Sequence, residues 1–532
     1  MKQALTSRLL LDLERLAARA AGLARRIGRP AVVVSVTAPA PPADPVTLFQ
    51  RASSWTRSRT LWMAPRGELA LVGLGAAAVI EAFGPEPVRP VEAAWRDLVE
   101  GAMVEGPAGA WGTGPVLLGG LAFDPAAGAD PVWEGFPPAR FVLPALLYTR
   151  DEGGAWVTLT RVVGAATDLA TNAANIPAAG ATAAVTGDGG AGERVAIRFP
   201  MDPAPTGEGQ RWLAWLEGVA AEPDRPTCGE GDRASDAAPD RAVTAVSGAA
   251  VTGMEEHPGP GAWRQAVEQA LAAIARGELR KVVLSRRVCL RTRTPFDAGD
   301  VLRRLRAGYP DCFLFCIPGG DAFFLGATPE RLARVRAGSL ETAAVAGSTR
   351  RGETEERDRE LGRALLANPK ERAEHALVVE MLREALAPLC ESLEVPAEPA
   401  LLRLGNVQHL HTPIRGAVRG RSVLQVVARL HPTPAVGGVP RGEALRFIRQ
   451  QEPAPRGWYA APVGWLDHHG EGEFAVAIRS GLLRGAEAWL FAGCGIVPGS
   501  DPQREYEETR LKLQPLLSAL GAGDAVRGEG WM

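Results

Sequence analysis

The chain has 532 residues, of which 46% are hydrophobic, and this composition is that of an ordinary folded protein with a large core. Its 59 lysine and arginine residues almost balance 61 aspartate and glutamate residues, which leaves a net charge of -2. Because there is no basic excess, nucleic acid and anionic membranes are poor candidate partners.

Residues 1–28 predict an amphipathic helix rather than a signal peptide. Asp12 and Glu14 lie inside its apolar stretch, which a signal peptide would keep free of acids. No apolar run elsewhere reaches membrane-spanning length. The six cysteines are scattered and form no CxxC pair, as is usual in a reducing compartment. We therefore expect a cytoplasmic protein that does not enter the membrane.

Short β-like runs alternate with glycine- and proline-rich turns over residues 30–165. The segment GLGAAA at 73–78 fits a dinucleotide-binding fingerprint only loosely, because no acidic residue follows at the expected place, and we interpret it as a strand-to-helix turn. Residues 222–261 are poor in large apolar side chains, which predicts a mobile surface insertion. This insertion separates an N-terminal part, 1–221, from a motif-dense region, 262–522.

The motif-dense region opens with an expected helix over 263–275 and a strand over 279–290. On this strand Lys281, Val283 and Ser285 share one face. An inward-facing lysine is costly unless it is paired or partly neutral, and a desolvated lysine can act as a general base. A solvated lysine at the start of an exposed strand fits the local pattern as well, so both interpretations stay open.

Three further segments carry polar groups that could serve a ligand. Glu330 follows a strand and a Thr-Pro turn, where it could protonate a leaving group if its pKa is raised, although a surface carboxylate is the simpler interpretation. The small-residue turn 346–349 allows close approach of a ligand. His409 and His411 are two apart on a strand without a third zinc ligand at suitable spacing, which favours a hydrogen-bonding or structural role.

Two expected helices each begin with a cap residue, a proline and a pair of glutamates. The first pair is Glu371 and Glu374, and the second is Glu505 and Glu508, with Lys512 on the same face. Either pair alone could simply complement the helix dipole. Together the two pairs predict a Mg²⁺ site, because this ion prefers oxygen ligands and keeps positions open for substrate.

Residues 473–495, which precede the last expected helix, predict an anion-binding surface. An alternating strand over 473–480 places Arg479 on a face with alanines, where its planar fork could grip a carboxylate, although a solvated edge-strand arginine is equally compatible. Gly493 and Gly495 flank a cysteine at a point where the backbone can approach a ligand closely. These features point to metal-assisted chemistry on a small organic acid.

A series of motifs resembles, in the same order, those of the chorismate-utilising enzymes. They are KVVLSR, the Pro-Glu of GATPE, VAGSTR, KERAEH, NVQHL, HPTPAVGGVP, RGWYAAPVGW, GEFAVAIRS, AGCGIV and SDPQREYEETRLK. The resemblance spans Trp263 to Leu520 and is looser in the N-terminal part. It implies an α/β (α+β) chorismate-binding fold like that of anthranilate synthase component I. Such a fold has two packed β-sheets with helices outside and the site in the cleft between the sheets.

Particular positions indicate the branch of this family. Lys281 stands where amidating members usually have glutamine, which implies water rather than ammonia as the nucleophile and no glutaminase subunit. Ala346 stands where aminodeoxychorismate enzymes carry a nucleophilic lysine. Ala435 resembles isochorismate synthases, whereas salicylate synthases tend to carry threonine there, and Tyr459 is shared by both. The resemblance favours an isochorismate synthase of the menaquinone type over a salicylate synthase for siderophores, an amidating subunit or a non-catalytic homologue.

The resemblance also implies a cofactor and its ligands. Mg²⁺ would be held chiefly by Glu374 and Glu508, with Glu371 and Glu505 nearby, and would bind the ring carboxylate of chorismate. The sequence is compatible with a monomer or a homodimer.

The resemblance assigns the remaining roles as well. Lys281 would activate the water that attacks C2, and Glu330 would protonate the departing C4 hydroxyl. The substrate would be held by Gly347, Ser348, His409, Ala435, Tyr459, Arg479, Gly493, Gly495 and Lys512.

Overall fold

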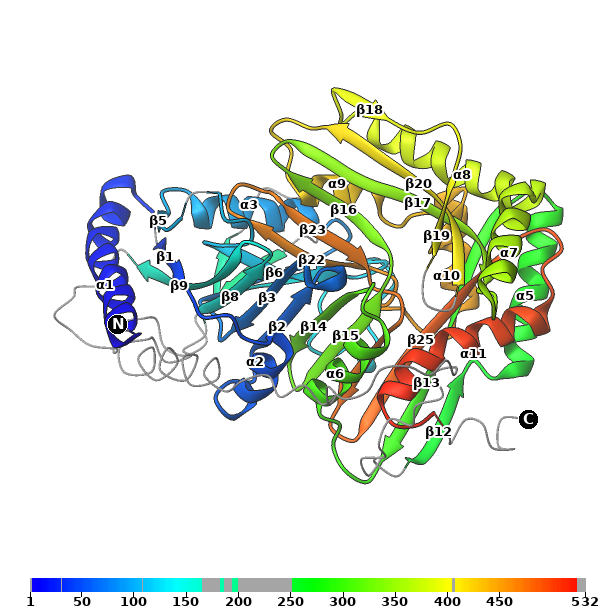
Figure 1. Cartoon of the computed structure of the whole chain (residues 1–532), viewed down its shortest axis with the longest axis horizontal. Helices are drawn as coiled ribbons and strands as arrows, with labels where there is room; N and C mark the ends of the chain where they lie inside the picture. Colours follow the sequence, from blue (N-terminus) through cyan, green and yellow to red (C-terminus); the bar gives the residue numbers. More distant parts are fainter. Residues whose placement is uncertain are drawn as a thin grey trace.

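The computed structural model describes residues 2–29, 31–107, 109–164, 182–185, 194–199, 251–403 and 407–523. These residues form two large, mainly antiparallel sheets with helices around them (Figure 1). The α/β (α+β) fold with two packed sheets is thereby confirmed.

The first sheet, sheet A, contains strands from both ends of the chain, so that β2 pairs with β14. Its order is β12 (Val251–His257), β13 (Lys281–Thr292), β25 (Glu487–Ile496), β24 (Ser480–Arg484), β15 (Ala322–Thr328), β14 (Phe313–Gly319), β2 (Arg59–Met63), β3 (Leu69–Leu74), β8 (Leu146–Asp151), β9 (Gly154–Gly164), β1 (Ala31–Pro39) and β5 (Met103–Glu105), with β21 (Gly438–Val439) beside β13.

The second sheet, sheet B, is mixed in the same way, since β6 pairs with β22. Its order is β10 (Thr182–Val185), β11 (Arg194–Arg198), β4 (Ala78–Phe83), β7 (Ala139–Leu143), β6 (Val116–Leu121), β22 (Pro462–Asp467), β23 (Gly472–Val476), β16 (Arg331–Arg336), β17 (Ser339–Arg350), β20 (Val407–Ala417) and β18 (Ser392–Glu394), with β19 (Ala400–Arg403) beside β20.

The described helices cover the outer surfaces of these sheets. They are α1 (Lys2–Ile27), α2 (Pro45–Arg51), α3 (Val88–Val99), α5 (Pro260–Ala275), α6 (Ala298–Gly308), α7 (Glu355–Ala367), α8 (Pro369–Leu386), α9 (Val423–Leu430), α10 (Arg441–Gln451) and α11 (Pro502–Ala519). One apolar core contains inner side chains of both sheets, including Phe315 and Phe474. A second core lies between sheet A and helices α1, α2, α6 and α11.

The helix ends follow the expected capping chemistry. Asn368 caps α8 and accepts hydrogen bonds from the N–H groups of Lys370 and Glu371. Asp501 caps α11 in the same manner and accepts from the N–H groups of Gln503 and Arg504. Each helix begins with a proline, whose missing N–H is no loss at that position.

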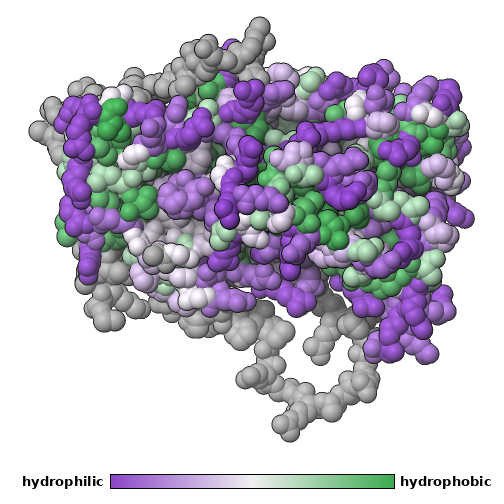
Figure 2. Space-filling model, turned by 90° about the horizontal axis from the view of Figure 1, so that it is seen from above, coloured by the Kyte–Doolittle hydropathy of each residue, from purple (hydrophilic) through white to green (hydrophobic). Residues whose placement is uncertain are grey.

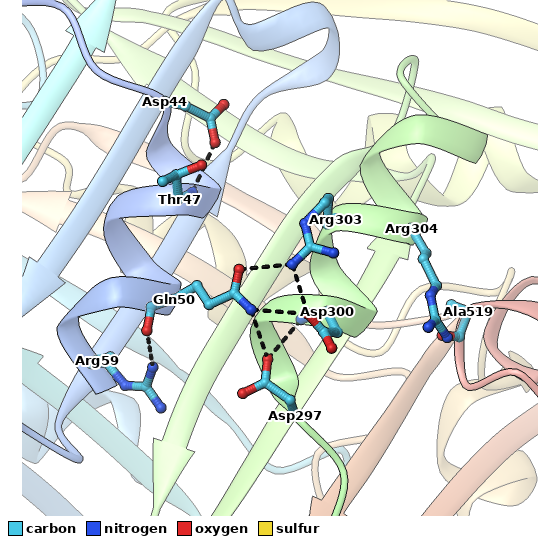
Figure 3. A network of polar contacts seen from close by, with 9 residues as sticks. All are labelled: Asp44, Thr47, Gln50, Arg59, Asp297, Asp300, Arg303, Arg304 and Ala519. Carbon is cyan, nitrogen blue, oxygen red and sulfur yellow. Dashed lines mark hydrogen bonds and ion pairs between the residues drawn. The ribbon is translucent and has the colours of Figure 1, made fainter. Parts of the chain in front are cut away.

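A polar network ties the N-terminal part to the C-terminal part (Figure 3). Gln50 of α2 donates from Nε2 to Asp300 Oδ1 of α6 at 2.8 Å, and its Oε1 accepts from Arg303 at 2.8 Å. Arg304 of α6 donates to the Ala519 carbonyl at the end of α11 at 2.9 Å. Segments far apart in sequence are therefore held together at this face of sheet A.

The structure corrects three predictions from the sequence. Residues 73–78 join strand β3 to strand β4, so the segment is a strand-to-strand turn and not the start of a helix. Residues 251–257 form the edge strand β12, so the expected insertion 222–261 does not reach residue 261, and its residues 222–250 lie outside the described chain. The expected strand 473–480 is interrupted, because β23 ends at Val476 in sheet B and β24 begins at Ser480 in sheet A.

The surface agrees with the balanced composition. On the face shown in Figure 2, hydrophobic residues form separate patches that hydrophilic residues interrupt. Among the described helices, none is both long and apolar enough to span a membrane.

Candidate active site

The predicted site residues come from both sheets and from helices α8 and α11. Lys281 begins β13, and Gly493 and Gly495 lie on the neighbouring strand β25. Ser348 and His409 are paired residues of β17 and β20 in the other sheet. Side-chain contacts join these segments into one site.

Lys281 is buried, with 5% of its surface exposed, and its Nζ donates to Glu374 Oε1 at 2.6 Å. This ion pair connects sheet A to helix α8. The neighbouring strand leaves room for the lysine, because a Cβ atom on Gly495 would lie 2.9 Å from Lys281 Cε. Lys281 is thus the inward-facing, paired lysine of the first interpretation and not a solvated one.

Glu330 directly follows the end of β15, and its backbone is bonded on both sides. Its N–H donates to Thr328 Oγ1 at 3.3 Å, and its carbonyl oxygen accepts from Val476 N at 3.0 Å. Burial raises the pKa of the Glu330 carboxyl to about 7, while the charges of Lys281 and Lys512 limit that rise. Unlike a surface carboxylate, this group can hold or release a proton near neutral pH.

The small-residue turn of β17 rests against helix α8. Gly347 forms a bulge in the pairing of β17 with β20 and has a φ of 77°. A Cβ atom there would lie 3.0 Å from Glu371 Oε2, the flexible end of a side chain, so the backbone conformation is the main reason for glycine at this position. The N–H of Ser348 donates to the same glutamate oxygen at 3.3 Å.

His375 fixes this turn and was not among the predicted site residues. Its Nδ1 lies 3.2 Å from the Ala346 carbonyl oxygen and donates to it, so Nε2 accepts from Thr412 Oγ1 at 2.8 Å. Burial lowers the pKa of the ring, which keeps it in the neutral form that these bonds need. Its place directly after Glu374 is the only signal in the sequence for this role, because its partners lie on strands β17 and β20.

His409 is a neutral hydrogen-bonding group. Its Nδ1 lies 2.7 Å from Ser348 Oγ. Burial, assisted by the charges of Arg479 and Lys512, lowers the pKa of His409 to about 4. Among the residues that the structure describes, no three histidine, cysteine, aspartate or glutamate side chains are arranged to hold a metal ion. The contact with Ser348 agrees with the hydrogen-bonding role expected for His409.

The four predicted Mg²⁺ ligands lie at the starts of α8 and α11, and the two chief ones face lysines. Glu374 pairs with Lys281, and Glu508 pairs with Lys512, each at 2.6 Å. Burial and the nearby charge of Glu508 raise the pKa of Glu505. Carboxylate oxygens are the donors that Mg²⁺ prefers, so the chemistry of these four side chains fits the ion, although Glu374 and Glu508 are each bonded to a lysine in this structure.

Arg479 lies at the crossing from β23 to β24 with a φ of 53°, and burial lowers the pKa of its guanidinium. The Tyr459 ring is buried and stacks on Phe491 with centroids 5.4 Å apart. A Cβ atom on Gly493 would lie 3.3 Å from Tyr459 Oη, and the Gly493 carbonyl accepts from Lys512 Nζ at 2.9 Å. Gly493 therefore keeps the tyrosine and the lysine close to the same stretch of backbone.

Ala435 lines a small pocket beside Glu330. The other lining residues are Arg331, Leu332, Thr342, Ala343, Val345, Val378, Leu382 and Thr433. A small side chain at position 435 leaves this pocket open next to the carboxyl group. The site as a whole combines an acid, an amine, cationic groups and clustered carboxylates, which suits proton transfer on a small anionic substrate.

This fold and site define a chorismate-binding enzyme, and the chain belongs to that family. The family described as chorismate binding enzyme matches residues 18–187 and 233–521, so the likeness extends into the N-terminal part. The salicylate biosynthesis isochorismate synthase of Pseudomonas aeruginosa is 36% identical over 515 residues, 96% of this chain and 94% of the relative. The isochorismate synthase MenF of Bacillus subtilis is 36% identical over 498 residues, 92% of this chain and 94% of the relative.

Solved structures agree with this assignment. The menaquinone-specific isochorismate synthase MenF of Escherichia coli has a TM-score of 0.67 and 26% identity, over 94% of this chain and 99% of that chain. Anthranilate synthase component I of Streptococcus pneumoniae has a TM-score of 0.61 and 21% identity, over 85% and 92% of the two chains, and shares the fold.

Proposed function

We propose that this protein is an isochorismate synthase, which adds water to C2 of chorismate and releases the C4 hydroxyl. The observation that carries the proposal is that one site holds both a buried lysine, Lys281, and a carboxyl, Glu330, whose pKa burial raises to about 7. Relatives that align over nearly the whole chain are isochorismate synthases. Such a lysine and acid are what addition and elimination at one ring require.

The two groups act on opposite ends of the reaction. The Lys281 amine takes a proton from water as the new C2–O bond forms, the ring double bonds shift and the C4–O bond breaks. Glu330 gives its proton to the departing oxygen, which leaves as water. Each group contributes about 10²–10⁴-fold to the rate. Lys281 Nζ donates to Glu374 in this structure, so it can contact the attacking water only when Glu374 engages another partner.

Other side chains bind and orient the substrate. Arg479 and Tyr459 hold the enolpyruvyl carboxylate together with the backbone at Gly347 and Gly493, and His409 lines the pocket as a neutral ring. Fixed orientation of the ring lets the acid and the base act on opposite faces.

A bound Mg²⁺, held chiefly by Glu374 and Glu508 with Glu371 and Glu505 nearby, would supply positive charge for the ring carboxylate of chorismate. Lys512 then balances the remaining glutamate charge and stays bonded to the Gly493 carbonyl.

We further propose a role in menaquinone synthesis in the cytoplasm, with no glutaminase partner. Support comes from the menaquinone-specific structural neighbour and from the free state of the described cysteines. The second candidate is a salicylate synthase, but the relative from salicylate biosynthesis is itself an isochorismate synthase, and Ala435 stands where salicylate synthases tend to carry threonine.

The purified protein should be incubated with chorismate and Mg²⁺ without ammonia, and the products separated by chromatography. Isochorismate in a reversible mixture with chorismate supports the proposal. Salicylate with stoichiometric pyruvate would move the protein to the second candidate. No turnover, even with ammonia added, would favour a binding protein without activity.

A further inference from the structure

A buried ion pair outside the predicted site lies in the loop between α10 and β22. The side chains of Glu452 and Arg456 are only 6% and 2% exposed, and Arg456 Nε donates to Glu452 Oε2 at 2.9 Å. Pro453 and Pro455 lie between them and restrict the loop backbone. A buried pair of this kind adds little net stability because both charges lose their hydration. We therefore ask which segments the pair holds in place.

The pair is bonded to the strand that carries Lys281. Arg456 Nη2 donates to the Val283 carbonyl at 2.7 Å, and Glu452 Oε1 accepts from the Ser285 N–H at 2.8 Å. Both bonds fall within four residues of the lysine on β13. Because Val283 and Ser285 lie on the same face of the strand as Lys281, their position sets the direction of its side chain.

The same arginine is bonded to two other parts of the site. Its Nη1 donates to the Val436 carbonyl at 2.8 Å, one residue after Ala435. Its own carbonyl oxygen accepts from the Tyr459 N–H at 3.1 Å. Its guanidinium also lies 4.2 Å from the centroid of the Phe123 ring, which helps to fix the planar group.

We infer that Glu452 and Arg456 are a positioning pair that sets the relative placement of Lys281, Ala435 and Tyr459. Neither residue needs to contact substrate for this role, since each acts through the backbone of a segment that does. The expected effect on turnover rests on the proposed function. The placement of the three segments by the pair does not.

Arg456→Lys tests this inference with the charge retained. A lysine ammonium cannot span the three acceptors that the planar guanidinium reaches. We expect kcat to fall by roughly ten-fold or more with KM for chorismate within about three-fold, since misplacement of reacting groups costs turnover more than binding. Glu452→Gln keeps an acceptor for the Ser285 N–H and should retain more activity than Arg456→Lys.

Arg287→Lys is the matched control. Arg287 lies on the same strand, pairs with Asp130 and stacks over Trp489 at 4.9 Å, so its ion pair and ring contact lie outside the Ala435 and Tyr459 segments. This variant should keep nearly normal kcat, with a melting temperature close to that of Arg456→Lys. Full activity in Arg456→Lys, or an equal loss in the control, would overturn the inference.

Hydrogen–deuterium exchange gives a readout that does not depend on turnover. Peptides over 281–287, 433–439 and 457–461 should exchange faster together in Arg456→Lys and unchanged in Arg287→Lys. Unchanged exchange in the first variant would also overturn the inference. If the three peptides exchange faster in Arg456→Lys but the wild-type protein makes no isochorismate, only the proposed function is contradicted.

Discussion

Lys281 fills space that a glycine at position 495 leaves open, since a Cβ atom there would lie 2.9 Å from Lys281 Cε. Gly495→Ala should therefore displace the lysine and lower kcat by roughly ten-fold, through misplacement of the base. Gly253→Ala is the control, because Gly253 also lies on a strand of sheet A and a Cβ there meets nothing within 4 Å. Steady-state kinetics measure kcat of both variants. Equal losses of kcat in the two variants, or no loss in Gly495→Ala, would refute the steric relationship.

Removal of either proton-transfer group should separate turnover from binding. Lys281→Ala and Glu330→Gln should each abolish measurable conversion, a loss of at least about 10²-fold, while chorismate binding persists. Isothermal titration calorimetry with Mg²⁺ present measures the binding, and product chromatography measures the turnover. Near-normal activity in either variant would be incompatible with the assigned roles.

The raised pKa of Glu330 also predicts a pH-dependent stability. A carboxyl whose folded pKa is about 7, above its ordinary value of 4.5, contributes stability below about pH 4.5 and loses it as the pH rises through 7. Glu330→Gln removes the cost of the buried charge, so it should stabilise the protein at pH 8 by roughly 1–3 kcal/mol and not at pH 5. Thermal unfolding at both pH values provides the comparison, and a gain that does not depend on pH would count against a buried charge at this position.

Clustered carboxylates predict coupled binding of metal and substrate. Burial and, to a smaller extent, the charge of Glu508 raise the pKa of Glu505, so a cation bound near them should ease the approach of the chorismate carboxylate. Chelation of Mg²⁺ should stop turnover and weaken chorismate binding by roughly ten-fold, with the reciprocal effect of chorismate on Mg²⁺ affinity. Equal chorismate affinity with and without Mg²⁺, measured by calorimetry, would argue against a shared site.

Local sequence signals predicted the elements that local chemistry determines. The Asn368 cap, the following proline and the glutamate pair define the start of α8 without help from the rest of the chain. The family motifs pointed to both glutamate pairs, Lys281 and Glu330, because each lies in a short stretch of residues, and their roles stay predictions.

Features that depend on distant partners were missed or wrong. The strand expected over 473–480 breaks because the chain crosses between sheets at Arg479, whose φ of 53° is a conformation that arginine rarely adopts. The polar segment 251–257 becomes a strand only through its pairing with β13. The pair of Glu452 with Arg456 gives no signal in sequence, because its partners at 283, 285 and 436 lie far along the chain.

The central claim is that solvent water attacks C2 while the C4 oxygen leaves. Conversion of chorismate in ¹⁸O-labelled water, followed by mass spectrometry of the isochorismate formed, tests it most directly. We expect one ¹⁸O atom at the C2 hydroxyl and none in the rest of the product at early times. Isochorismate that carries only unlabelled oxygen would show that the original hydroxyl is transferred within the substrate, and would contradict the account.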